Sequence, residues 1–419
     1  MVYTKIPKVT KEDFKTRSKI LKVPNLRFPE FKEEWEEKTL KEMGTFLGGG
    51  TPTSANPDFW NGTFPWISSS DLEEDNINTV RLTRFITQNA IDNSATKLCR
   101  APVILIVSRV GVGKVAYSIK DVCTSQDFTN IIDIKCNGLF LAFLLSNVMK
   151  KQLCNVQGTS IKGISSAEIK SLKVFIPKER EQLHIANFIS LIDERIKCQS
   201  KLIKGWESFK GEIIKKIFSG QIKFKDNEAN DFPAWQNKTL GEITTIVNKK
   251  NKDNEKFPVY SINNKSGFIP QNEQFEGIDS NSRGYNIQLY KIINKNTFAY
   301  NPARINVGSI GYSGDLDNII ISSLYVCFRT NSSINDYFLL HYLKTDFFKQ
   351  DVLKKVEGGV RDYLFYENFA KISLSIPCIV EQLKIATFLS NIDNKIDLET
   401  ALLKQLKLQK KYLLQQLFI

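Results

Sequence analysis

The sequence predicts a mixed α/β (α+β) protein with a pseudo-two-fold internal repeat, in which two α/β domains are combined with two long helices that form a coiled coil. Three observations support this fold class. One segment is written almost identically at Val174 and at Leu374. A long apolar run at helical spacing follows each copy, and β-branched runs with glycine turns precede each copy. The composition, 42% hydrophobic and 25% charged in 419 residues, is that of an ordinary folded protein.

The repeat has a fixed beginning and a fixed end. Its end is Ile-Pro followed by Glu-Gln-Leu-x-Ile-Ala-x-Phe-x-Ser-x-Ile-Asp, starting at Ile176 and at Ile376. Its beginning is Trp-x-x-Lys-Thr-Leu-x-Glu, at Trp35 and Trp235, each after a Phe-Pro pair. The copies diverge between these ends, although residues 109–117 still resemble residues 304–312. The two repeats therefore share their ends and differ in the sequence between them.

The end of each repeat predicts a helix of about 40 residues, roughly 60 Å long. A helix of this length needs a partner helix, and the simplest partner is the helix of the other repeat. We therefore expect a two-helix coiled coil whose polar interruptions help to fix the register. The alternative is that each helix packs on its own domain. The apolar positions are Ile185, Ile189, Ile192, Ile196, Ile203, Trp206, Ile213 and Ile217, and Ile385, Leu389, Ile392, Ile396, Leu403, Leu406, Leu413 and Leu417; the polar interruptions are Gln199, Lys210, Glu399 and Lys410.

These patterns divide the chain into five parts. We expect a basic N-terminal leader (1–22), a first domain (23–176), a first long helix (177–224), a second domain (225–376) and a second long helix (377–419). Strands are predicted in residues 103–119 and 318–328, which are β-branched. Residues 51–72 and 256–272 are rich in Ser, Thr, Asn, Lys and aromatics, and we interpret them as loops. Such side chains can read base edges, but they are also typical of any surface loop.

Charge and composition narrow the class of partner. The chain has 58 Lys+Arg against 45 Asp+Glu, a net charge of +13, which favours a polyanion such as nucleic acid, although a merely basic surface would give the same count. Its apolar stretches are too short for a membrane helix, and we expect a cytoplasmic protein that makes no membrane contact. Seven scattered cysteines and two histidines make a metal site or a disulfide framework improbable.

The sequence predicts no catalytic residue. Gly48 to Gly50 match the glycines of an S-adenosylmethionine site only by letter, because they continue into Thr-Pro, and Asn56-Pro57 lacks the second proline of an adenine-methylating motif. Gly111 to Lys114 lack the first glycine of a phosphate-binding loop.

Several motifs resemble those of the specificity (S) subunit of type I restriction-modification systems, and the resemblance covers nearly the whole chain after about Val23. It implies two target-recognition domains, each reading one half of a split double-stranded DNA sequence, separated by two antiparallel helices. It further implies that these helices recruit two adenine-methylating modification (M) subunits and, through them, two ATP-dependent restriction (R) subunits. The motifs are the two helix starts, Gly-Gly-Gly-Thr-Pro (48–52), Pro-Trp-Ile-Ser-Ser (65–69), Ser-Gln-Asp (125–127) and Asn-Pro-x-Arg-Ile-Asn-Val-Gly (301–308).

The resemblance makes this chain a non-catalytic subunit that binds no cofactor, with S-adenosylmethionine, ATP and Mg²⁺ on its partners. The alternatives are a DNA adenine methyltransferase with its own catalytic site fused to a recognition domain, and a helix-turn-helix regulator, against which the long helices argue. The candidate DNA-binding residues are Ser68, Ser69, Arg109, Lys114, Asn263, Asn264, Lys265, Arg304 and Asn306. The candidate subunit-docking and spacer residues are Gln182, Ile185, Ile189, Ile192, Ile196, Gln382, Ile385, Leu389, Ile392 and Ile396.

Overall fold

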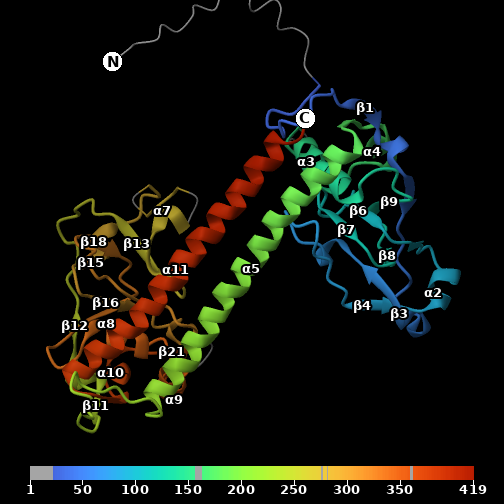
Figure 1. The fold of residues 1–419 in the computed structure, drawn as a ribbon. Helices are drawn as coiled ribbons and strands as arrows, with labels where there is room; N and C mark the ends of the chain where they lie inside the picture. Colours follow the sequence, from blue (N-terminus) through green and yellow to red (C-terminus); the bar gives the residue numbers. More distant parts are fainter. Residues whose placement is uncertain (1–21, 156–162, 275–276, 281, 359–361) are drawn as a thin grey trace, which may run out of the picture. The chain divides into compact units, whose positions relative to one another are not determined.

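The structure is a computed structural model that describes residues 22–155, 163–274, 277–280, 282–358 and 362–419 (Figure 1). All but the last residue of the predicted basic leader therefore lies outside the described residues. The chain divides into two compact units: unit 1 is Met1–Ser200 with Ala401–Ile419, and unit 2 is Lys201–Thr400.

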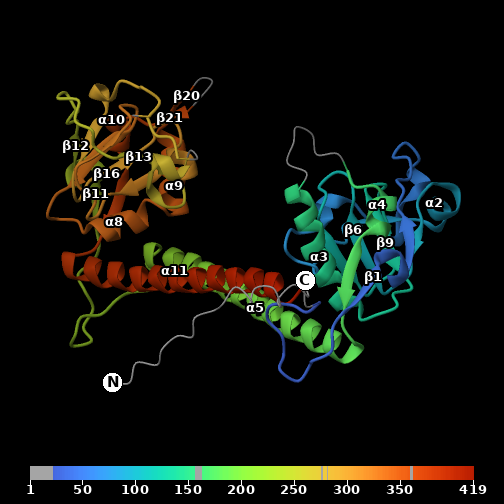
Figure 2. The ribbon, with the colours of Figure 1, turned by 90° about the horizontal axis from the view of Figure 1, so that it is seen from above.

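Unit 1 contains two four-stranded sheets and one two-stranded sheet. One sheet is antiparallel throughout, in the order β2-β9-β6-β7; the other, β4-β3-β8-β5, has one parallel pair, β3 with β8. Helix α3 packs on β6 and β7 (Figure 2). The strands are β1 (Glu36–Thr39), β2 (Thr45–Gly48), β3 (Trp60–Ile67), β4 (Arg84–Ile86), β5 (Leu98–Cys99), β6 (Val103–Val107), β7 (Val115–Ser118), β8 (Val122–Thr124), β9 (Phe128–Ile132) and β10 (Lys173–Ile176). The helices are η1 (Leu40–Met43), η2 (Pro57–Phe59), η3 (Ser69–Asp71), α2 (Gln88–Asn93), α3 (Gly138–Asn155) and α4 (Ser166–Ser171).

Unit 2 repeats this plan with the sheets β12-β19-β16-β17 and β14-β13-β18-β15, the latter again with one parallel pair, β13 with β18. Its strands are β11 (Gln236–Thr239), β12 (Thr244–Val247), β13 (Val259–Asn263), β14 (Gly267–Pro270), β15 (Lys291–Ile293), β16 (Phe298–Tyr300), β17 (Ile310–Tyr312), β18 (Ile319–Ile321), β19 (Val326–Thr330), β20 (Glu357–Gly358), β21 (Asp362–Tyr363) and β22 (Ser373–Ile376). Its helices are α6 (Leu240–Ile243), α7 (Gln271–Gln274), η4 (Ile287–Leu289), η5 (Ile305–Val307), α8 (Asp336–Tyr342), α9 (Asp346–Lys355) and α10 (Tyr366–Phe369).

Apart from the hairpin of β20 and β21 in unit 2, the described strands of the two units correspond one to one, which confirms the internal repeat. The order β2-β9-β6-β7 corresponds to β12-β19-β16-β17, and β4-β3-β8-β5 corresponds to β14-β13-β18-β15. The repeated ends form the same small sheet in each unit: Glu36 pairs with Ile176, and Gln236 pairs with Ile376. The divergent middle of the sequence thus builds one fold twice.

The twice-written residues make equivalent contacts at the start of each long helix. Trp35 Nε1 donates to Glu181 (3.3 Å), as Trp235 Nε1 donates to Glu381 (3.2 Å). The buried Gln182 side chain accepts from the Asn137 backbone N–H and donates to the Pro177 carbonyl. Gln382 makes the same two bonds, to the Asn335 N–H and the Pro377 carbonyl. The repeated text therefore encodes the joint between each helix and its own domain.

The two long helices are α5 (Glu179–Phe218) and α11 (Ile379–Gln416), 40 and 38 residues long, as predicted (Figure 1). In unit 1, Asp193 of α5 is 2.5 Å from Lys410 of α11. In unit 2, Lys210 of α5 pairs with Asp393 of α11. From the first pair to the second, the residue number rises along α5, from 193 to 210, and falls along α11, from 410 to 393. The two helices are therefore antiparallel. The predicted interruptions Lys210 and Lys410 thus lie in the seam as members of matched ion pairs.

The predicted pairing of the two long helices is confirmed, and the helices also pack on the domains. In unit 1, Ile185 and Ile189 of α5 belong to the same core as the β-sheet residue Ile104, and Leu413 and Leu417 at the end of α11 complete that core. In unit 2, Ile217, Ile385 and Leu389 pack in the corresponding core. Each helix therefore packs on its partner helix and on a domain.

The prediction of loops at residues 51–72 and 256–272 was wrong. The first range contains β3, and the second contains the hairpin of β13 and β14. Both ranges were interpreted as loops because they are rich in Ser, Thr, Asn, Lys and aromatic residues. Pro65 pairs with Phe85 of β4, and the parallel pairing of β3 with β8 begins only at Trp66. A bulge also interrupts β3 between Trp60 and Phe64. The strand can therefore contain a proline, which has no backbone N–H to donate.

None of the helices in the described part of the chain is both long enough and apolar enough to cross a membrane.

Candidate nucleic-acid interface

In unit 1 the predicted DNA-binding residues come together on two adjacent loops. The loop between β6 and β7 lies beside the turn that follows β3: a Cβ on Gly111 would be 3.7 Å from the side chain of Ser69. Lys114 Nζ joins the loops by donating to the carbonyls of Ser69 (3.3 Å) and Leu72 (3.0 Å). We call residues 68–72 with 108–114 surface 1.

The residues of surface 1 have different roles. Lys114 is half-buried and its ammonium is bonded to backbone carbonyls, so it positions the surface. Arg109 is exposed, and its neighbour Val110 is 71% exposed at the tip of the loop. Arg109 is thus the cation of surface 1 that is free to reach a polyanion.

Ser68 is held by an arginine that sequence reasoning missed. Arg84 of β4 donates to Ser68 Oγ (2.6 Å), forms an ion pair with Asp71 and lies 4.7 Å from the centre of the Trp66 ring. The Ser68 N–H donates to Asp71 (2.8 Å). The cross-strand pairing of Trp66 with Arg84 brings these groups together. Sequence reasoning missed the pairing of Trp66 with Arg84, because it had predicted β3 as part of a loop.

The same juxtaposition occurs in unit 2. The Asn263 carboxamide accepts from the N–H groups of Lys265 (3.0 Å) and Ser266 (2.6 Å), so it shapes the β13–β14 turn and leaves Asn264 and Lys265 exposed. The loop between β16 and β17 lies next to this turn: a Cβ on Gly308 would be 3.9 Å from the Asn264 carbonyl. We call residues 263–267 with 301–309 surface 2.

Arg304 and Asn306 belong to surface 2. Arg304 is exposed and Asn306 is half-buried. The matched loops differ in detail: Ile305, next to Arg304, is 1% exposed, whereas Val110, next to Arg109, is 71% exposed. The two surfaces therefore share a framework and an exposed arginine, and present different side chains around it.

The Gly-Gly-Gly-Thr-Pro motif has a packing role. A Cβ on Gly49 would lie 2.1 Å from the Ser125 carbonyl oxygen, and one on Gly50 would lie 2.2 Å from the Ala95 carbonyl oxygen. Trp66 Nε1 donates to the Gly50 carbonyl (3.0 Å). These glycines let the backbone approach other backbone segments closely.

The titratable residues of the described part of the chain form no metal-binding cluster, since they include no group of three or more His, Cys, Asp or Glu side chains that could hold a metal ion. Burial raises the pKa of Cys99 to about 12 and that of Cys123 to about 11, so both thiols are protonated and poorly nucleophilic at neutral pH.

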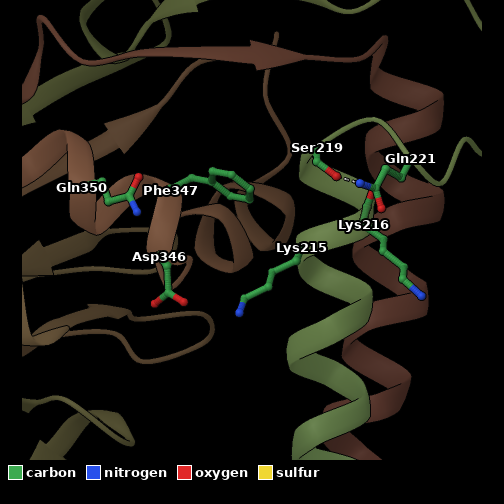
Figure 3. A pocket seen from close by; sticks show the side chains of 7 residues that line it. All are labelled: Lys215, Lys216, Ser219, Gln221, Asp346, Phe347 and Gln350. Carbon is green, nitrogen blue, oxygen red and sulfur yellow. Dashed lines mark hydrogen bonds between the residues drawn. The ribbon is translucent and has the colours of Figure 1, made fainter.

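Figure 3 shows a pocket of about 380 Å³ in unit 2, between the end of α5 and the start of α9. Side chains of both signs line it, without a buried nucleophile or base. The lining residues are Lys215, Lys216, Ser219, Gln221, Asp346, Phe347 and Gln350.

The predicted docking residues are not on the surface of the helices. Gln182, Ile185, Ile189, Gln382, Ile385, Leu389 and Ile392 are buried, and Ile192, Ile196 and Ile396 are half-buried. They stabilise the helix–domain joints and the cores, because the apolar stripe of a helix faces the protein interior. The exposed apolar residues of the two helices are others: Leu183, Leu191, Leu202 and Phe209 on α5, and Ile379, Val380, Leu383, Phe388, Leu398, Leu402, Leu408 and Tyr412 on α11.

Comparison with known families decides what this duplicated architecture is. The family model of the type I restriction modification DNA specificity domain matches residues 32–207 and, a second time, residues 234–408. The chain belongs to this family. Each match covers one sheet-containing domain and most of the long helix that follows it, so the family domain and the internal repeat are the same unit. The chain is a non-catalytic specificity subunit that recognises a DNA target.

Specificity subunits of known systems resemble it over most of its length. It is 25% identical over 371 residues to the type I restriction enzyme MjaIX specificity subunit of Methanocaldococcus jannaschii, covering 82% of this chain and 83% of that protein. It is 32% identical over 178 residues to the EcoR124I/EcoR124II specificity subunit of Escherichia coli, 40% of this chain. The crystal structure of the S subunit from M. genitalium has a similar fold, with a TM-score of 0.55 at 18% identity over 95% of this chain and 99% of that one.

Proposed function

We propose that this specificity subunit reads a bipartite double-stranded DNA target, one half with surface 1 and the other with surface 2. The observation that supports the proposal is the duplication of the four-stranded sheets, which places an exposed arginine, Arg109 or Arg304, on the equivalent loop of each unit. The polar residues around each arginine differ, so the two surfaces suit different base sequences. The net charge of +13 favours the DNA backbone.

We further propose that the gap between the half-sites is determined by the two long helices. The chain passes from one unit to the other only along α5 and α11, each a single uninterrupted helix in the structure. A helix of 40 residues is about 60 Å long, comparable to 17 or 18 base pairs at roughly 3.4 Å per pair.

The outer faces of α5 and α11 are the proposed docking sites for two modification subunits, and restriction subunits bind through these. Leu183 and Leu383 occupy equivalent positions, and they are 47% and 50% exposed. Exposed leucines in matched positions suit two copies of one partner. S-adenosylmethionine, ATP and Mg²⁺ then act on the partner subunits, and the complex acts in the cytoplasm, where the DNA is.

Docking is tested with Leu183→Asp and Leu383→Asp, separately and together. Each single variant should reduce the modification subunits bound per chain from two to one, and the double variant should bind none. Leu324→Asp is the control, because Leu324 is 76% exposed but lies outside the helices. Native mass spectrometry counts the subunits. Unchanged counts in the double variant would contradict the proposed docking sites.

The function itself is tested by methylation. The chain produced with its modification subunits should methylate adenines in a two-part motif. The isolated chain should transfer no methyl group from S-adenosylmethionine to DNA, and transfer by the isolated chain would establish the alternative, a methyltransferase with its own catalytic site.

A further inference from the structure

The ion pair between Asp193 and Lys410 in unit 1 is well buried. The carboxylate side chain is 14% exposed and the ammonium side chain 8%, and they are 2.5 Å apart. Burial raises the pKa of Asp193, because desolvation outweighs the favourable charge of Lys410. A buried pair of this kind contributes little net stability, but it disfavours any arrangement that leaves either charge alone.

Both charged groups also bond to one loop of the domain. Asn78 Nδ2 donates to Asp193 Oδ2 (3.0 Å), and Lys410 Nζ donates to the backbone carbonyl of Asp75 (3.0 Å). The Asp75 side chain forms an ion pair with Lys150 of α3. Helix α5, helix α11 and the domain therefore meet in one set of polar contacts.

That loop, residues 73–80, is internally bonded and continues directly from surface 1. Asn76 donates to Thr79 Oγ1 (2.8 Å) and to Glu73 (3.0 Å), and Ile77 is buried, with its carbonyl accepting from the Tyr117 N–H (2.8 Å). Its ends are tied to residues 71 and 72 by a bond from the Arg81 N–H to the Asp71 carbonyl (3.0 Å) and by the Leu72–Val80 bridge.

We propose that Asp193, Lys410, Asn78 and Asp75 form a clamp that fixes the orientation of surface 1 on the helices, so that Asp193 and Lys410 are positioning residues for DNA recognition. The role in recognition rests on the proposed function. Without the clamp, the joint at Gln182 and the shared apolar core still attach the domain to the helices, but loop 73–80, and with it surface 1, is no longer fixed to them. The subunit then accepts more than one gap length between unchanged half-sites.

The pair in unit 2 offers a matched control. Lys210 and Asp393 are equivalent to Lys410 and Asp193, and Asp393 faces His341 of α8, with its carboxylate 38% exposed. His341 is the counterpart of Phe143, because Asn335 and Asn137 cap α8 and α3 in the same way. Exchanging the charges of Lys210 and Asp393 leaves every contact of the clamp intact.

The decisive variant exchanges the clamp charges, Asp193→Lys with Lys410→Asp. It keeps an ion pair between the helices but removes both bonds to the loop, since a lysine cannot accept from Asn78 and an aspartate cannot donate to the Asp75 carbonyl. Asn78→Ala removes the bond to Asp193 and leaves the Asp193–Lys410 ion pair unchanged. This second variant tests the clamp even if the chain with exchanged charges does not fold.

Two measurements are made on each variant. Spin labels on exposed positions of α5 and β3, at Lys197 and Thr63 with the native Cys198 replaced by serine, report the distance distribution within unit 1 in the full chain without DNA. Sequencing of methylated adenines reports the gap lengths used by the assembled enzyme. The exchanged variant and Asn78→Ala should broaden the distance distribution and gain sites whose gap differs by one base pair. The unit 2 exchange should leave the unit 1 distances as narrow as in the natural chain.

An unchanged narrow distribution in the exchanged variant and in Asn78→Ala would show that the pair only joins the helices, and it would overturn the clamp. A broadened distribution with a single unchanged gap would overturn its role in recognition. Failure of the natural chain to direct methylation to a two-part motif would instead refute the proposed function, and the label distances, measured without DNA, would still test the clamp.

Discussion

Lengthening both helices by four residues should lengthen the recognised gap. The insertions go between Ser200 and Lys201 in α5 and between Thr400 and Ala401 in α11, using residues of high helix propensity. These positions are the boundaries of the two units. The Asp193–Lys410 pair lies wholly in unit 1 and the Lys210–Asp393 pair wholly in unit 2, so neither pair is disrupted.

The magnitude follows from helix geometry. Four residues add about 6 Å along a helix and rotate it by about 40° beyond a full turn. One base pair adds about 3.4 Å and rotates B-DNA by roughly 35°. The added length corresponds to one or two base pairs and the added rotation to one. We therefore expect a gap longer by one or two pairs, with both half-site sequences unchanged.

Sequencing of methylated adenines in cells that produce the assembled enzyme measures both quantities. The control is the same insertion in α5 alone, which leaves helices of unequal length and should reduce methylation at every gap. An assembled double-insertion enzyme that kept the original gap would refute the reasoning. A change in half-site sequence would mean that the helices themselves contact bases.

Three further predictions follow from the structure. Burial holds the pKa of His341 at about 4, well below its ordinary value of 6.5, so the folded state disfavours protonation of the imidazole. The stability that depends on a neutral imidazole is therefore complete above pH 6.5. It is lost as the pH falls towards 4, at up to about 1.4 kcal/mol per pH unit. Urea unfolding between pH 4 and 7 should show this slope for the natural chain, and His341→Phe, which introduces the residue of the other repeat, should reduce it. Arg109→Ala and Arg304→Ala should each cost about 1 to 3 kcal/mol of binding and relax one target position if the guanidinium reads a base, and should weaken binding to all sequences equally if it contacts phosphate; unchanged affinity in both would remove the two loops from the interface. A permuted chain that begins near Asp226, with the C-terminal helix joined by a short linker to the segment before Trp35, should fold and bind the same DNA, and failure of this chain to fold would contradict the circular repeat.

The circular repeat has direct support in the contacts at the end of each helix. In the first copy, the carbonyl of Lys216 accepts from the N–H of Ile222, six residues further along the chain (3.0 Å). In the second copy, the equivalent carbonyl of Gln416 accepts from the N–H of Leu26 (3.0 Å). The N-terminal segment therefore makes, at the end of α11, the contact that Ile222 makes at the end of α5.

The parts of the fold that depend on periodicity could be predicted from the sequence. The apolar series of α5 and α11 runs for many turns, and the polar interruptions at Lys210 and Lys410 marked the seam, since a lysine among apolar residues must find a carboxylate when it is buried. The repeated Gln182 and Gln382 marked a shared structural task, although their bonds to Asn137 and Asn335 are visible only in the fold.

The details of the reading surfaces could not be predicted, because they depend on strand register and loop packing. Lysine is a residue type that commonly contacts DNA, yet the ammonium of Lys114 donates to backbone carbonyls of the neighbouring turn. Arg84 holds Ser68 only because β3 and β4 pair in one particular register. The residues predicted for docking and for the spacer are buried or half-buried, since periodicity identifies an apolar stripe but not what that stripe contacts.

The central claim, that each unit reads one half of a split target, is tested most directly by exchanging a single reading unit. Residues 40–172 are replaced with the corresponding segment of another specificity subunit, with the clamp residues Asp75 and Asn78 retained, and methylated adenines are mapped genome-wide. The account predicts that one half-site changes while the other half-site and the gap stay as they were. A target in which both half-sites change together, or a single uninterrupted motif in the natural chain, would contradict it.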